Sequence, residues 1–302
     1  MFNISVLNRR NELVPEASWQ YRGDRLLPAK ENIAFTRLIR LKPSEYANRQ
    51  VLSLLSGGGG NENYFHWMFD VLPRWHLFKS LEAFDDMNVS YLMPNPKHDF
   101  QRDSIAYLGI DESKQIHSEG QIHIRVSEGN IFTTQHPRHG NESGCPRWII
   151  DFLRESFLPL VEPFSPSKHS KRIYISRAKA SRRRIINESE FVSRLKPMGF
   201  KIVSLEDKSL EEQVNLFNHA QIIISPHGAA LANLAFCKEG VKLIEIFPKG
   251  CIIPLYSEIA KRAKIYYHLV EGLPHEGSNK KKLNSDFEVN CNDVFNHIEA
   301  SN

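Results

Sequence analysis

The second half of the chain alternates between short apolar segments and amphipathic segments, and this alternation constrains the fold more than any other feature. Three of the apolar segments are KRIYISR, QIIIS and KLIEIF, at residues 171–177, 221–225 and 242–247. They have the length of strands, and the segments between them have the length and apolar spacing of helices. Strands that alternate with helices, and that are apolar on both faces, are typical of an α/β fold with a doubly wound parallel sheet.

Local signals mark the ends of two of these helices. Ser209 and Glu212 have the spacing of a capping box, in which each side chain satisfies a free backbone amide at a helix start. Gly199 follows the apolar pattern of residues 188–198 and predicts the end of that helix. The other elements that we expect in this half are strands at residues 201–205 and 265–270 and helices at residues 210–220, 227–236 and 255–264.

The first half is less regular. The Pro- and Ser-rich segment 162–170 is the best linker candidate, so we expect an N-terminal domain at residues 1–165 and a C-terminal domain at residues 166–302. A length of 302 residues also fits two domains. The elements that we expect before the linker are strands at residues 50–55, 89–93, 122–126 and 130–134 and helices at residues 63–84, 100–108 and 147–158.

The composition excludes several classes of protein. With 41% hydrophobic and 25% charged residues the chain is globular, not disordered or collagen-like. A net charge of +4 fits a phosphorylated ligand or an anionic membrane surface and is too small to indicate a nucleic-acid binder. No secretion signal is visible and no apolar stretch reaches the roughly 18 residues of a membrane span, so we expect a cytoplasmic protein that can still touch the inner membrane face peripherally.

A run of small residues follows the expected strand at residues 221–225. The segment reads SPHGAALAN and ends at Asn233. In an open α/β sheet such a strand-to-helix junction lies at the carboxyl end of the strands, where ligands bind, and a helix start favours phosphate. Gly228 and Ala229 let the backbone approach a phosphate closely, and His227 can donate to a phosphate or sugar oxygen. Alternatively, the small residues only permit tight packing and His227 is a core histidine.

A basic segment follows another expected strand. It reads RAKASRRR, from Arg177 to Arg184. Guanidinium groups form bidentate hydrogen bonds to phosphate oxygens, which suits recognition of a diphosphate. A solvated loop or a patch for nucleic acid is the alternative. Because a small-residue helix start lies in the same predicted sheet, the sequence favours a diphosphate site.

Glu245 lies near the end of the expected strand at residues 242–247. A carboxylate at this place can accept hydrogen bonds from both hydroxyls of a ribose. Burial of a carboxylate without a partner is costly, so a bound ligand or a nearby arginine would explain it. The alternative is a structural ion pair.

In the first half, the segment NYFHWMFDVLPR at residues 63–74 carries the chemistry. If this segment is helical, His66 and Asp70 lie four residues apart and face each other. A carboxylate beside an imidazole holds one tautomer and raises its basicity, which is a common arrangement for a general base. Pro73 is expected to kink or end the helix near Asp70. A surface His–Asp pair of small energetic value is the alternative.

Together these segments resemble glycosyltransferase family 61. The matching blocks are NYFHWMFDVLPR, RIYISR with RRIINESE, IIISPHGAALANLAF and IEIFP, between residues 63 and 248. Within them, Asn187 and Asn233 are further candidates for donor binding. The resemblance implies a GT-B fold, in which two Rossmann-like doubly wound domains face each other across a cleft. The N-terminal domain would bind the acceptor and the C-terminal domain the donor.

The resemblance also implies an inverting, metal-independent transfer of a sugar from a nucleotide sugar, usually UDP-linked, to a hydroxyl of a glycan or lipid-linked glycan. Capsular or lipopolysaccharide biosynthesis is the pathway that we expect. The sequence contains no Asp-x-Asp triplet, which agrees with a site that uses no divalent metal and no cofactor besides the nucleotide sugar. Arg177, Arg184 and the helix start at Gly228 are then the candidates for neutralising the diphosphate.

For the general base, His66 is the first candidate, Asp70 the second and Glu62 the third. Two other functions stay open. One is a non-catalytic module that binds a nucleotide sugar or a glycan at the same site. The other is a nucleic-acid binder built on residues 182–184, which ranks last because the chain has no RNA-binding aromatic motif.

Overall fold

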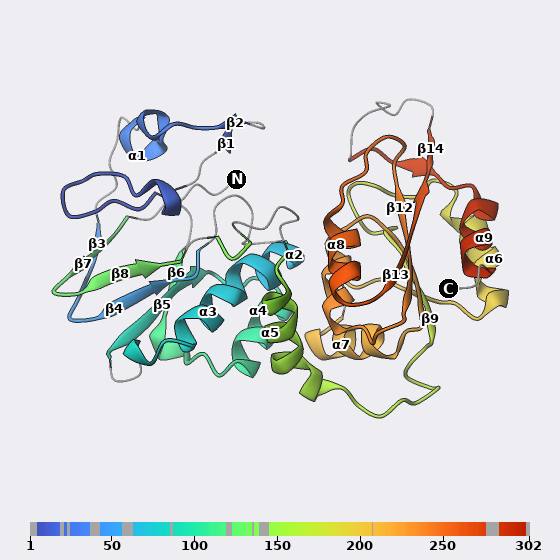
Figure 1. The fold of residues 1–302 in the computed structure, drawn as a ribbon, viewed down its shortest axis with the longest axis horizontal. Coiled ribbons are helices and arrows are strands. Elements are labelled where there is room, and N and C mark those ends of the chain that lie inside the picture. The colour runs from blue at the N-terminus through green and yellow to red at the C-terminus, as the bar shows by residue number, and fades with distance from the viewer. Residues whose placement is uncertain are drawn as a thin grey trace. The chain divides into compact units, whose positions relative to one another are not determined.

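The chain forms two compact units, Met1–Asn141 and Glu142–Asn302, each built around its own parallel sheet (Figure 1). No helix among the residues described is long and apolar enough to cross a membrane. The computed structural model describes residues 5–18, 21–22, 25–36, 43–55, 63–84, 87–118, 123–134, 136–138, 145–206, 208–275 and 284–299.

Four parallel strands form the main sheet of the first unit, in the order β6-β5-β4-β8. Their bounds are Gln50–Ser53 for β4, Val89–Pro94 for β5, Gln115–Ser118 for β6 and Asn130–Thr133 for β8. A separate parallel pair joins β3 (Ser44–Ala47) to β7 (Ile124–Ser127). The sequence did not predict β3 or β6, which are short and partly exposed and therefore lack an apolar pattern.

The helix predicted at residues 63–84 is shorter and contains an irregular turn. It consists of α2 (Tyr64–His66), a π-helical turn η3 (Trp67–Val71) and α3 (Leu72–Lys79). In the π turn, the amide of Leu72 donates to the carbonyl of Trp67, five residues back. Pro73 has no amide hydrogen and its ring crowds the preceding turn, so a wider turn at this point keeps the helix continuous.

Short elements complete the first unit. Those at the start of the chain are η1 (Pro15–Ala17), β1 (Tyr21–Arg22), β2 (Arg25–Leu26), η2 (Ala29–Glu31) and α1 (Ile33–Thr36). Those near the main sheet are η4 (Glu82–Phe84), α4 (Asp99–Tyr107) and η5 (Glu112–Lys114).

Five parallel strands form the sheet of the second unit, in the order β10-β9-β11-β12-β13. Each lies at a place that the sequence predicted, and β12 is buried along its whole length. The expectation of an α/β fold with parallel sheets is confirmed. The bounds are Arg172–Ile175 for β9, Lys201–Val203 for β10, Ile222–Pro226 for β11, Lys242–Phe247 for β12 and Tyr266–Glu271 for β13.

Helices cover both faces of this sheet: α6 and α9 lie on one face, and α7 and α8 on the other (Figure 1). The predicted capping box is present, because Ser209 Oγ accepts from the Glu212 amide and the Glu212 carboxylate accepts from the Ser209 amide. Gly199 ends the α6 segment in the left-handed conformation, with φ +80°. The helical bounds are Arg147–Phe157 (α5), Leu158–Leu160 (η6), Glu188–Leu195 (α6), Lys196–Met198 (η7), Leu210–His219 (α7), Ala229–Phe236 (η8), Leu255–Arg262 (α8) and Cys291–Glu299 (α9).

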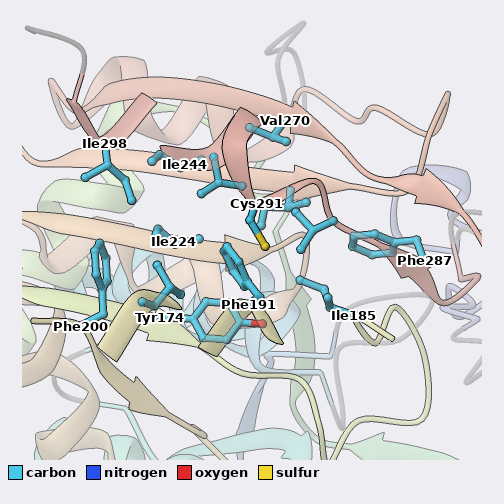
Figure 2. Packing of buried hydrophobic residues seen from close by; sticks show 14 residues of the cluster. Tyr174, Ile185, Phe191, Phe200, Ile224, Ile244, Val270, Phe287, Cys291 and Ile298 are labelled. Carbon is cyan, nitrogen blue, oxygen red and sulfur yellow. The ribbon is translucent and has the colours of Figure 1, made fainter. Parts of the chain in front are cut away.

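The last part of the chain completes the core of the second unit. Residues beyond 270 have no recognisable sequence motif, yet β15 (Phe287–Glu288), which pairs with β14 (Leu273–Pro274), and α9 bring apolar side chains into it. Figure 2 shows Phe287, Cys291 and Ile298 packed with residues of the sheet and of α6. The core of this unit therefore needs residues up to α9.

The boundary between the units lies before α5, whereas the sequence placed the domain boundary in the linker after it. In the structure α5 packs on the second unit. Arg154 Nη1 donates to the carbonyls of Ala235 (3.2 Å) and Cys237 (2.8 Å), and the Phe157 ring meets the Phe236 ring edge-on. The assignment of one half to the acceptor and the other to the donor stays a prediction. Glu62, the third candidate base, lies outside the described residues.

Phe191 tests the core shown in Figure 2. Its side chain is fully buried between Tyr174 and Phe295, so we expect Phe191→Ala to lower the free energy of unfolding by about 3–5 kcal/mol. Glu190→Ala, at the exposed neighbouring position, should change it by less than about 0.5 kcal/mol. Urea denaturation followed by circular dichroism measures both variants, and equal losses in the two would contradict this description of the core.

Candidate functional site

The strand order of the second unit defines where a ligand can bind. From β9 the chain moves to β10 on one side and then returns to β11 on the other, so the direction of winding reverses between β9 and β11. In doubly wound sheets ligands bind outside the carboxyl ends of the strands at such a reversal. Arg177 lies in the segment that follows β9, and His227 begins the segment that follows β11.

The structure brings Arg177 and Gly228 into contact at this point. A Cβ atom built on Gly228 would collide with Nη1 of Arg177. The φ of Gly228 is −179°, an extended conformation that any residue adopts. Residue 228 is therefore constrained by the close guanidinium and not by its backbone, because a Cβ there would have to push the end of the Arg177 side chain aside. Arg177 is held in place by its own loop, since its Nε and Nη2 donate to the carbonyl of Arg182 at 3.3 and 3.0 Å.

Arg183 is the cation in this region that lacks a partner. Its guanidinium makes no hydrogen bond to the described residues, and its Nε is buried. Burial, together with the charges of Arg177 and Arg182, lowers the pKa of Arg183 to about 10. Buried polar groups in proteins are almost always hydrogen-bonded, and an unpaired buried charge is costly. An anionic ligand between Arg177 and Arg183 would remove that cost.

Arg184, which the sequence selected, has a different environment. Its Nη2 and Nε donate to Asp286 Oδ2 at 2.6 and 2.9 Å, and this hydrogen bonding raises the pKa of the Arg184 guanidinium. Because a carboxylate already engages this guanidinium, a role of Arg184 in binding a diphosphate stays a prediction.

The two candidate asparagines are also engaged inside the protein. The side chain of Asn187 donates to the carbonyl of Val289 (2.9 Å) and accepts from its amide (3.0 Å). Asn233 is fully buried, and its Nδ2 donates to Gln213 Oε1 and to the carbonyl of Ala230, both at 3.0 Å. Both asparagines stabilise the framework around the site. Ala229 is the first residue of η8 and is half-buried.

Glu245 and His227 form a buried pair. Glu245 is 0% exposed; its Oε1 lies 2.6 Å from Nδ1 of His227, and its Oε2 accepts from the hydroxyl of Tyr267 at 2.8 Å. Burial raises the pKa of the Glu245 carboxyl, and the hydrogen bond from His227 opposes that effect. Because both oxygens are occupied, the geometry matches the structural-pair alternative better than a carboxylate open to ribose.

The first unit has its own reversal point, between β4 and β8. The helix with His66 and Asp70 follows β4, and His136 and Arg138 follow β8. Nδ1 of His66 lies 2.6 Å from Oδ2 of Asp70, as the spacing predicted. The Asp70 side chain is 2% exposed and that of His66 is 38% exposed, so the imidazole is the accessible member of the pair.

Asp70 is surrounded by the side chains of Arg138, His136 and His66. Arg138 donates to it from Nε (2.6 Å) and Nη2 (3.2 Å), and His136 Nε2 lies 3.6 Å from its Oδ1. Burial alone would raise the pKa of Asp70, but hydrogen bonds from His136 and His66 and the charge of Arg138 bring it well below its ordinary value. Asp70 is therefore ionised, and Arg74, whose Nε donates to the Asp70 carbonyl, adds further positive charge nearby.

The hydrogen bond to Asp70 fixes the tautomer of a neutral His66. An ionised carboxylate can only accept hydrogen bonds, so Nδ1 of His66 carries the proton and a neutral imidazole keeps its lone pair on Nε2. Nε2 makes no hydrogen bond to the described residues. The geometry thus suits His66 for taking a proton. The lowered pKa of Asp70 makes its carboxylate the weaker base of the two candidates.

No group of three or more metal-ligating side chains occurs among the described residues. A cavity of about 750 Å³ lies at the amino ends of β11 and β12, the edge opposite Gly228, and is lined by Lys171, His219 and Lys242 among others. Lys242 Nζ donates to the carbonyl of His297 near the end of α9, so this lysine supports a helix end.

Comparison with known proteins decides the family. The family model described as Glycosyltransferase 61 matches residues 64–244 of this chain, which is more than half of its 302 residues. The chain belongs to the glycosyltransferase 61 family. The match includes the His66–Asp70 pair and the Arg177–Gly228 contact, so the family resemblance of these segments is confirmed. A capsular or lipopolysaccharide type stays a prediction.

Relatives of this glycosyltransferase 61 protein carry names of glycosyltransferases. This chain is 28% identical over 148 residues to Protein O-linked-mannose beta-1,4-N-acetylglucosaminyltransferase 2 of Canis lupus familiaris. It is 34% identical over 151 residues to the protein of the same name from Homo sapiens. Each match covers 48% of this chain and 24% of the relative. It is 30% identical over 110 residues to Xylan glycosyltransferase MUCI21 of Arabidopsis thaliana, covering 34% of this chain and 22% of the relative. These matches span about a quarter of the relatives' length, and the names support a glycosyltransferase enzyme.

Sequence reasoning missed four residues of these two sites in the glycosyltransferase 61 protein: Arg183, Tyr267, His136 and Arg138. Arg183 lay in the basic segment, but the letters RRR do not show which arginine a carboxylate engages. Tyr267 and Arg138 reach their partners from other strands or loops. The approach of His136 and Arg138 to the first reversal point becomes visible only with the strand order.

Replacing Asp70 tests the charge cluster of the first unit. Asp70→Asn leaves Arg138 and Arg74 without a carboxylate, and we expect it to lower the free energy of unfolding by about 3–5 kcal/mol at pH 7. A folded-state pKa below the unfolded value of about 3.9 stabilises the protein fully above pH 4 and progressively less below it.

The difference in stability between wild type and Asp70→Asn should therefore stay constant from pH 7 to about pH 5 and shrink below about pH 4. Urea denaturation at a series of pH values measures it. Asp99→Asn, at an exposed surface ion pair, is the control and should cost less than about 1 kcal/mol. A difference that already shrinks at pH 6 would contradict the depressed pKa.

Proposed function

We propose that this protein transfers a sugar from a nucleotide sugar, with UDP as the expected nucleotide, to a hydroxyl of a glycan acceptor. The observation that carries the proposal is a pair of interacting guanidiniums at the reversal point of the second sheet: Arg177, which lies against Gly228, and Arg183, whose pKa the charge of Arg177 helps to lower. A nucleoside diphosphate gains negative charge as the bond to the anomeric carbon breaks. Preorganised cations stabilise that charge more in the transition state than in the ground state.

Arg183 takes the place that the sequence gave to Arg184. Two guanidiniums can form bidentate hydrogen bonds with a diphosphate, and no divalent metal is part of this proposal. His227 is a third candidate, because its Nε2 makes no hydrogen bond among the described residues. It can donate from Nε2 to a phosphate oxygen when the Glu245 carboxyl, whose pKa burial raises, is protonated and donates to Nδ1.

The acceptor reaction is assigned to the first unit. His66 is the proposed general base, acting through Nε2, and Asp70 orients it and holds its tautomer. Direct attack by the acceptor hydroxyl on the face opposite the leaving diphosphate inverts the anomeric centre. A GT-B arrangement of the two units belongs to the same proposal.

The names of the relatives favour a glycan acceptor. One relative is named for transfer onto O-linked mannose and another for xylan. For this chain we propose a glycan or lipid-linked glycan of a surface polysaccharide, without naming the sugar. The second candidate function is a non-catalytic module that binds a nucleotide sugar at the same site. The accessible His66 imidazole, paired with buried Asp70, favours the enzyme over it.

Arg183 is the sharpest test of the donor site. Arg183→Ala should weaken UDP binding roughly 10- to 100-fold, because a hydrogen bond to a charged group is worth about 1.5–3 kcal/mol. Arg182→Ala removes an exposed neighbour of the same charge and should have little effect. Isothermal titration calorimetry with UDP in the presence of EDTA measures both. Equal affinities for Arg183→Ala and wild type would refute the donor site.

His66 separates the enzyme from the binding module. His66→Ala should lower turnover by about 10²–10⁴-fold while UDP affinity stays within twofold of wild type, because the base acts on the acceptor and not on the donor. UDP release from a panel of UDP-sugars, with glycan acceptors and EDTA, measures turnover. His117→Ala, at an exposed position of β6, is the control. Unchanged turnover in His66→Ala would remove His66 from the mechanism.

A further inference from the structure

A segment near the end of the chain runs beside the basic loop of the donor site. Ile185 and Phe287 form an isolated parallel bridge. The amide of Phe287 donates to the carbonyl of Arg184 at 3.1 Å, and the amide of Ile186 donates to the carbonyl of Phe287 at 2.8 Å. The segment lies beyond residues 64–244, which match the family, so the family match does not describe it.

Asp286 holds Arg184 by its backbone and its side chain at once. Oδ1 accepts from the Arg184 amide at 2.8 Å, and Oδ2 accepts from Nε at 2.9 Å and Nη2 at 2.6 Å. Burial by itself raises the pKa of Asp286, but the hydrogen bonds from Arg184 bring it below its ordinary value, so the carboxylate is ionised.

The contacts between Asp286 and Arg184, called the clamp below, lie next to the hydrophobic core. Ile185 and Phe287, one on each side of the bridge, are 4% and 1% exposed and belong to the cluster drawn in Figure 2. The positions of Arg184 and Asp286 relative to each other are therefore fixed by packed neighbours as well as by the ion pair.

The residue between these contacts is Arg183, and its backbone has an unusual conformation. Its φ is +57°, in the left-handed region that a residue with a long side chain rarely adopts. The residue before it is tied to Arg177 through the Arg182 carbonyl, and the residue after it is tied to Asp286 through the Arg184 amide. Such a conformation persists only when the surroundings determine it, and it often marks a functional site.

We infer that Asp286 is a positioning residue for the donor site: by clamping Arg184 it holds Arg183 in its left-handed conformation, with the guanidinium unpaired and ready for the diphosphate. Arg184 thus serves the site through its ion pair and Arg183 through direct contact. The inference rests on the proposed function, because it takes a nucleoside diphosphate as the ligand of Arg183.

A double-mutant cycle with UDP as the probe tests the inference. Affinities for UDP are measured by calorimetry with EDTA for wild type, Asp286→Ala, Arg183→Ala and the double variant. We expect Asp286→Ala to weaken binding about tenfold and to have almost no further effect once Arg183 is alanine, because the clamp acts through that side chain. A general loss of structure would weaken binding in both backgrounds.

Two further variants keep the test decisive. Asp286→Asn retains an acceptor for the Arg184 amide and should weaken binding less than Asp286→Ala; it replaces the alanine variant in the cycle if that variant does not fold. Glu288 lies in β15, close to Asp286 in sequence, and its carboxylate pairs with His275. Glu288→Gln should leave UDP affinity unchanged.

The outcomes separate the two proposals. If Arg183→Ala binds UDP as wild type does, the donor site itself is wrong and the clamp falls with it. If Arg183→Ala weakens binding but Asp286→Ala does not, or if the two losses add, the donor site stands and the clamp is overturned.

Discussion

The contact between the Arg177 guanidinium and Gly228 is the constraint on which the proposed donor site depends. β9 and β11 pair side by side, and the segments that follow them bring the end of the Arg177 side chain so close to Gly228 that a Cβ there would push it aside. The strand order brings the two segments together at the carboxyl edge of the sheet. The absent side chain of Gly228 lets the cation lie against the backbone, and the loop carbonyl of Arg182 orients it. Any larger residue at position 228 would displace the charge that the site is built to present.

The buried carboxylates of both units have partners within the protein, and Arg183 differs from them in this respect. Buried Asp70 is matched by Arg138 and His66, and buried Glu245 by His227 and Tyr267. Each of these carboxylates has its oxygens satisfied inside its own unit. Arg183 breaks the pattern, because a guanidinium with a buried Nε has no acceptor among the described residues. Within the described parts of the chain this group has no acceptor, and the proposed diphosphate would supply one.

The sequence predicted what local periodicity determines. The five strands of the second sheet, the capping box at Ser209 and the pairing of His66 with Asp70 follow from spacing along the chain. The partners of Arg184 and Glu245 come from segments far away in sequence, and no local pattern encodes them. For the same reason the role of the residues after 270 was invisible: an isolated bridge and one short helix carry too little periodicity to be recognised.

The choice between Arg183 and Arg184 shows how a run of like charges acquires different functions. In sequence the two are equivalent, but in the structure Arg183 has a left-handed backbone conformation and Arg184 is bound to Asp286. Arg184 binds a carboxylate and becomes part of the scaffold, whereas Arg183 binds none among the residues that the structure describes. The ion pair of Arg184 is half-exposed and contributes little stability by itself. Its effect is geometric: it fixes the amide that follows Arg183, and so determines which of three adjacent cations an incoming diphosphate can meet.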